Sequence, residues 1–167
     1  MNRIIVIGGN GSGKSTFAKK LHSSTGLPLV HLDRLLWYGD WQVRERAEFD
    51  ALLGAELEKD RWIIDGNYNR TIERRMAACD TVFVLDYPVE VCLAGAAARV
   101  GQVREEMPWT DTELRPDLAQ YIRDFPSTQL PHVYELAAQY AQGRRIVVLH
   151  SRDEADAWLR LYETGKA

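Results

Sequence analysis

The chain has 167 residues, of which 46% are hydrophobic and 27% charged, with a formal net charge of −3. This length and composition are typical of a single globular domain. The slight acidity argues against a surface built to bind nucleic acid or an anionic membrane, and no apolar run approaches the roughly 18 residues of a membrane span.

The apolar pattern alternates between the spacing of strands and that of helices. Between strand-like runs, Phe49, Leu52, Leu53 and Leu57 share one face of a predicted helix, and Ser151 followed by Glu154 predicts a capping box for a last helix. The alternation predicts an α/β fold whose parallel sheet is covered on both faces. The predicted strands are five short runs rich in β-branched residues, at 4–7, 29–32, 62–64, 81–85 and 146–149.

Two further features bear on location and on mobility. Cys79 and Cys92 lie in apolar helical patterns without metal-like spacing, and the N-terminus enters a strand without signal-peptide features, so we expect buried free thiols and a cytoplasmic protein. The segment from about 101 to 131 has no strand and contains four prolines. It is either a plain helical excursion or a cover over an active site, and we favour the cover.

A glycine-rich motif joins the first strand to the first helix. Its residues are Gly8, Gly9, Asn10, Gly11, Ser12, Gly13, Lys14, Ser15 and Thr16. The spacing fits the P-loop template G-x-x-x-x-G-K-[ST], in which backbone N–H groups and the helix N-terminus bind phosphate. We expect Lys14 to reach the β- and γ-phosphates of ATP and the Ser15 hydroxyl to ligate Mg²⁺.

Two carboxylates are candidates for the metal side of this site. Asp65 and Asp86 each follow an apolar strand and are expected at the carboxyl edge of the sheet, where ligands bind in such folds. The residues alone leave the choice between them open.

An acceptor side is predicted after the second strand. Asp33, in the sequence "HLD", is placed either to orient or deprotonate an acceptor hydroxyl or to cap the next helix. Trp37, Tyr38 and Trp41 follow, and either stack on a planar acceptor or seal the core. His31 is expected to be a core or supporting residue.

Five stretches of the chain resemble one known group. "GGNGSGKST", "HLDRLLW", "WIIDGNYNRT", "VFVLDYP" and "GRRIVVLHSRDEADAWL" resemble the adenylate-kinase-like P-loop proteins called DNA topology modulation proteins, over residues 3–159. The resemblance implies a three-layer P-loop NTPase fold of the nucleoside monophosphate kinase type, with sheet order 2-3-1-4-5 and Asp65 as the metal-side acid. It also implies one domain over 1–167, with an acceptor-binding arm at about 34–60 and a lid-like helical segment at about 101–131.

The resemblance also assigns roles to arginines. It implies that Arg70 grips an acceptor phosphate and that Arg99 and Arg104 clamp the transferring phosphoryl group. Gly95 departs from the pattern, because the group usually has there an arginine that lies against adenine, so the base preference is open.

These observations predict an ATP-dependent phosphotransferase that acts on an unidentified small-molecule or nucleotide acceptor. The alternative is an ATP-binding regulatory protein or weak ATPase linked to DNA topology or expression. We expect no membrane partner and no direct contact with nucleic acid. A signalling GTPase is disfavoured, because no lysine between Lys59 and Lys166 can form an N-K-x-D element.

Overall fold

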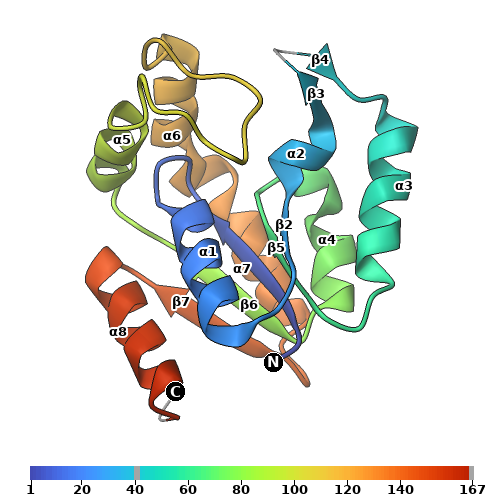
Figure 1. Cartoon of the computed structure of the whole chain (residues 1–167). Coiled ribbons are helices and arrows are strands. Elements are labelled where there is room, and N and C mark those ends of the chain that lie inside the picture. Colours follow the sequence, from blue (N-terminus) through green and yellow to red (C-terminus); the bar gives the residue numbers. More distant parts are fainter. Residues whose placement is uncertain (40–41, 166–167) are drawn as a thin grey trace.

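The computed structural model describes residues 1–39 and 42–165. A parallel five-stranded sheet forms its centre, in the order β2-β5-β1-β6-β7, which confirms the predicted order 2-3-1-4-5 (Figure 1). The strands are β1 (Arg3–Gly8), β2 (Leu29–His31), β5 (Trp62–Asp65), β6 (Thr81–Leu85) and β7 (Arg145–Leu149).

Helices cover both faces of the sheet, and this makes three layers (Figure 1). Ile4 and Val6 of β1 pack with α1, α5 and α8, whereas Ile5 and Ile7 pack with α3, α4 and α7. All four side chains are fully buried, because a central parallel strand is enclosed on both sides. These helices are α1 (Lys14–Thr25), α3 (Arg46–Leu57), α4 (Asn69–Ala78), α5 (Val89–Ala97), α7 (Leu130–Gln139) and α8 (Arg152–Glu163).

The region after β2 differs from the prediction. Helix α2 (Leu32–Leu36) begins at once, so Asp33 lies in its first turn rather than at the end of a strand. A small antiparallel hairpin, β3 (Trp37–Gly39) with β4 (Gln42–Val43), follows and was not predicted. Trp41, one of the three predicted aromatics, lies outside the described residues.

The structure divides the predicted lid segment into two parts. Residues 98–115 form an irregular loop, which we call the 98–115 loop, and α6 (Pro116–Thr128) follows it. Ile122 and Phe125 of α6 are buried in the core, so this part of the predicted lid belongs to the packed fold.

Two local predictions are confirmed. The backbone N–H of Glu154 donates to the Ser151 Oγ at 3.1 Å at the start of α8, and Cys79 and Cys92 are buried free thiols. Within residues 1–39 and 42–165, no helix combines the length and apolar character that crossing a bilayer requires.

Candidate active site

A cavity of about 580 Å³ opens at the carboxyl edge of the sheet, lined by the P-loop, α2, the segment after β5 and the 98–115 loop. Besides Asn10 of the P-loop, six predicted site residues line it together: Lys14, Ser15, Asp33, Asp65, Arg99 and Arg104.

The P-loop presents the start of α1 to this cavity. Gly11 and Gly13 have φ of 83° and 93°, a conformation that glycine adopts without steric cost. Among the described residues, no side chain caps α1 and its first turn contains no acid. The first amides of α1, together with its partial positive charge, are therefore suited to an anion.

Lys14 is the most buried charge of the loop, with 9% of the residue exposed. Its ammonium donates to the Gly9 carbonyl at 3.1 Å. Desolvation and the neighbouring Arg99 charge lower the pKa of Lys14 to about 8, although Asp65 and Asp33 oppose the shift. A phosphate anion would supply the counter-charge that this buried ammonium favours.

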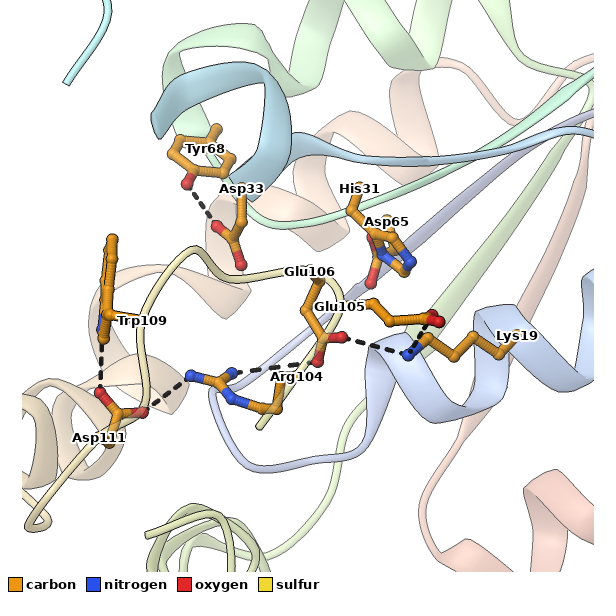
Figure 2. Close-up of polar contacts among 10 residues, drawn as sticks. All are labelled: Lys19, His31, Asp33, Asp65, Tyr68, Arg104, Glu105, Glu106, Trp109 and Asp111. Carbon is orange, nitrogen blue, oxygen red and sulfur yellow. Dashed lines mark hydrogen bonds and ion pairs between the residues drawn. The ribbon is translucent and has the colours of Figure 1, made fainter. Parts of the chain in front are cut away.

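Asp65, at the end of β5, contacts a histidine that sequence reasoning left without a role. His31 Nδ1 lies 2.6 Å from Asp65 Oδ1, and both residues are buried (Figure 2). They meet because β2 and β5 are neighbours and His31 is in register with Asp65. This contact fixes the orientation of the carboxylate.

The residues at this point fit a magnesium ion. Asp65 and Ser15 line the same cavity beside the uncapped start of α1. Carboxylate and hydroxyl oxygens are the ligands that Mg²⁺ prefers, and the ion usually takes few protein ligands besides phosphate oxygens and water.

Asp33 also lines the cavity, next to a tyrosine. The Tyr68 hydroxyl donates to Asp33 Oδ1 at 2.5 Å (Figure 2). Desolvation raises the pKa of Asp33, although the hydrogen bond from Tyr68 and the Lys14 charge oppose the shift. The carboxylate is therefore more basic than an exposed one would be.

A buried arginine supports the segment that carries Tyr68. Arg75 on α4 has no exposed surface; its guanidinium donates to the Gly66 carbonyl at 2.9 Å and also to the Asn67 and Tyr68 carbonyls. Burial lowers the pKa of Arg75 to about 9. Tyr68 has φ of 35°, which is unfavourable for a non-glycine residue, and these hydrogen bonds hold it in place.

The 98–115 loop brings two arginines to the cavity. Arg99 follows α5 and is half-buried, and desolvation and the charge of Arg104 lower its pKa. Arg104 pairs with Asp111 at 2.8 Å and lies 4.0 Å from Glu106 (Figure 2).

Ion pairs attach the loop to α1. Lys19 Nζ lies 3.2 Å from Glu106 and 3.3 Å from Glu105, so the 98–115 loop lies against the phosphate-binding helix (Figure 2).

Three sequence-predicted candidates lie elsewhere. Arg70 forms two hydrogen bonds, of 2.7 and 2.9 Å, with Asp50 of α3 and is not among the residues that line the cavity. Asp86 accepts from the Tyr134 hydroxyl at 2.6 Å and is likewise absent from the lining. Thr16 is exposed on α1. This geometry gives no support to an acceptor-binding role for Arg70.

Gly95 has a steric role. A Cβ there would lie 2.1 Å from the Gly11 carbonyl oxygen and 2.8 Å from an Arg152 nitrogen. Helix α5 can therefore approach the P-loop closely only because residue 95 has no side chain. An arginine at this position would displace the loop.

We expect Gly95→Ala to lower the free energy of unfolding by about 1 to 3 kcal/mol, because helix and loop must separate. Gly54→Ala is the matched control, since its Cβ would meet only the flexible end of the Arg74 side chain. It should be neutral or slightly stabilising, because alanine favours a helix. Urea unfolding of both variants tests this, and an undiminished midpoint for Gly95→Ala would contradict the steric account.

The sequence is similar to adenylate kinases. It is 30% identical over 97 residues to adenylate kinases from Thermotoga neapolitana and Thermotoga petrophila, in matches that cover 56% of this chain and 43% of each relative. The chain thus spans less than half the length of these curated relatives. No protein-family model matches the chain.

The fold is that of small-molecule kinases. Shikimate kinase from Acinetobacter baumannii, solved with shikimate, superposes with a TM-score of 0.62 and 16% identity, covering 99% of this chain and 95% of that one. A gluconokinase from Sinorhizobium meliloti gives 0.58 and 16%, covering 98% and 94%. These likenesses establish the P-loop kinase architecture.

Proposed function

We propose that this protein is a phosphotransferase that moves the γ-phosphate of Mg²⁺-ATP to a small-molecule acceptor. The observation that carries the proposal is the shared cavity, which the P-loop lysine, a metal-side carboxylate, a basic carboxylate and the predicted arginines Arg99 and Arg104 line together. The similarity to adenylate kinases and the shikimate kinase fold support it.

The donor half consists of the P-loop and Arg99. The α1 amides and Lys14 bind the triphosphate, and Arg99 faces the phosphoryl group as negative charge spreads over its oxygens. Ser15 and Asp65 would hold Mg²⁺, which would neutralise charge on the β- and γ-phosphates. His31 orients Asp65 for that task.

The acceptor half centres on Asp33. The Tyr68 hydroxyl occupies one carboxylate oxygen, so the other remains for an acceptor hydroxyl. A carboxylate of raised pKa in that position serves as a general base. The reaction uses ATP, and Cys79 and Cys92 are buried free thiols. Both features agree with the cytoplasmic location expected from the sequence.

The resemblance to DNA topology modulation proteins suggests an alternative function, that of an ATP-binding regulatory protein or weak ATPase. The two functions differ in the fate of the γ-phosphate. The test is a transfer assay with purified protein, labelled ATP and a panel of small hydroxylated molecules and nucleotides. Label in any organic product supports the phosphotransferase, whereas label released only as inorganic phosphate refutes it in favour of the ATPase.

The two candidate carboxylates should respond differently to amide substitution. Asp65→Asn should raise the Mg²⁺ concentration for half-maximal turnover by about tenfold to a hundredfold, since a ligand charge is lost beside Ser15. Asp86→Asn should stay within about twofold of the wild type, because Asp86 lies outside the cavity lining. Mg²⁺ titrations of turnover measure both effects. A larger effect of Asp86→Asn would show that the metal lies beside Asp86 and that the assignment to Asp65 is wrong.

A further inference from the structure

The acceptor half of the cavity has aromatic walls. The rings of Trp37 and Trp109 pack edge to face, with centroids 4.9 Å apart and planes at 90°. Both tryptophans and Tyr68 line the cavity, with the Tyr68 hydroxyl directed at Asp33 (Figure 2). Flat indole faces beside a carboxylate suit a ring that carries hydroxyl groups.

The two arginines in the acceptor half of the cavity already form ion pairs with carboxylates. Arg104 pairs with Asp111, and Arg115 forms two hydrogen bonds with Asp117, one of them at 3.0 Å. The other two cations in the described lining are Lys14 and Arg99, which belong to the donor half proposed above.

The charges of the cavity disfavour a second anion beside the triphosphate. The described lining residues include four basic side chains and five carboxylates before any ligand binds. A triphosphate would engage Lys14 and Arg99. A phosphate or carboxylate on the acceptor would then lie near Asp33, where each remaining cation of the described lining already pairs with a carboxylate. The negative charge of the acceptor would repel the Asp33 carboxylate, and this repulsion would disfavour acceptors that contain a phosphate or a carboxylate.

The chemistry of Asp33 points the same way. A phosphate acceptor is already ionised near neutral pH and has no proton that must be removed. An alcohol must lose its hydroxyl proton as it attacks, and a basic carboxylate at the reaction centre meets that need.

We propose that the acceptor is an uncharged cyclic alcohol, a sugar- or nucleoside-like ring that packs against the Trp37–Trp109 pair and directs one hydroxyl at Asp33. This inference rests on the proposed phosphotransferase function. The acceptor oxygen forms a bond to the γ-phosphorus, the bond from that phosphorus to the β,γ-bridging oxygen breaks, and ADP leaves with the electron pair. The hydroxyl proton passes to Asp33.

The test compares matched pairs of acceptors with the full chain, Mg²⁺ and labelled ATP. The pairs are adenosine with AMP, cytidine with CMP, glucose with glucose 6-phosphate, and glucose with glucuronate. We expect the favoured acceptor to be uncharged, with a kcat/KM at least about tenfold above that of its anionic partner, as one like-charge contact implies. The nucleoside and sugar arms distinguish the two kinds of ring.

Preference for the anionic member of a pair overturns the inference and leaves the phosphotransferase intact. Absence of label in every organic product overturns both. Variants add a second readout: Asp33→Asn should lower kcat for the uncharged acceptor by about a hundredfold or more, with little change in its KM. Arg70→Ala, which alters a residue outside the cavity lining, should leave kcat/KM for that acceptor within about twofold. A large loss in Arg70→Ala would show that the acceptor contains an anionic group.

Discussion

Lys14→Met should abolish Mg²⁺-ATP turnover and, at pH 7, make the folded protein more stable. Turnover is lost because the ammonium that offsets the β- and γ-phosphate charge is gone. Stability rises because the pKa of about 8, against an ordinary 10.5, means that the buried ammonium costs the folded state about 3 kcal/mol at pH 7. The lost hydrogen bond to Gly9 offsets about 1 kcal/mol of that gain.

The pH dependence of the effect follows from the same pKa. Between pH 8 and 10.5 the unfolded chain holds a proton on Lys14 that the folded chain has released, so wild-type stability from this group rises with pH. The advantage of Lys14→Met should therefore shrink across that window. Urea unfolding of both proteins at pH 7 and pH 10 measures it, and a variant less stable than the wild type at pH 7 would contradict the burial argument.

A second lysine on the same helix provides the control. Desolvation opposes the shift at Lys19, but the charge and hydrogen bond of Glu106 outweigh it and raise the pKa of Lys19. Because Lys19 is partly exposed, Lys19→Met should cost less than about 1 kcal/mol, with turnover retained. The two substitutions remove the same charge from one helix and should have opposite effects on stability.

Arg99→Ala should reduce turnover by about a hundredfold or more, the range of a donor that stabilises transition-state charge. The dissociation constant of ATP should change much less, because ground-state binding depends on the P-loop. Arg99→Lys should recover only part of the loss, since an ammonium lacks the planar fork of the guanidinium. Single-turnover rates and equilibrium titrations with ATP separate the two quantities.

Arg123→Ala, on the exposed side of α6, is the control and should behave as the wild type. If Arg99→Ala instead lowers ATP affinity and turnover by the same small factor, Arg99 contributes only to binding. The case for phosphoryl transfer would then be weaker.

The features that could be predicted from the sequence are those that follow from a repeated apolar pattern or from a motif of fixed spacing. The sheet order followed from the resemblance, and the burial of Ile4 to Ile7 followed from their continuous apolar pattern. The strand-edge argument placed both Asp65 and Asp86 near Lys14 and Ser15, and only the resemblance chose Asp65, which lines the cavity with them.

The remaining features depend on contacts between residues far apart in the chain. The orientation of Asp65 by His31 depends on the register of β2 on β5. Arg75 could not be distinguished from the other arginines, because its partners are backbone carbonyls, which leave no mark on residue type. The resemblance gave Arg70 a site role, but its guanidinium pairs with the carboxylate of Asp50 on α3, and Arg70 is not among the residues that line the cavity.

The central position of β1 has a consequence for synthesis on the ribosome. Ile4 of β1 pairs with Ile63 on one side and with Thr81 on the other, so this strand is made about 60 residues before its first neighbour. At about 5 to 20 residues per second, both edges stay open for about 3 to 12 s. An apolar strand with open edges is a site of aggregation, so the nascent chain needs protection there until translation has passed β5 and β6.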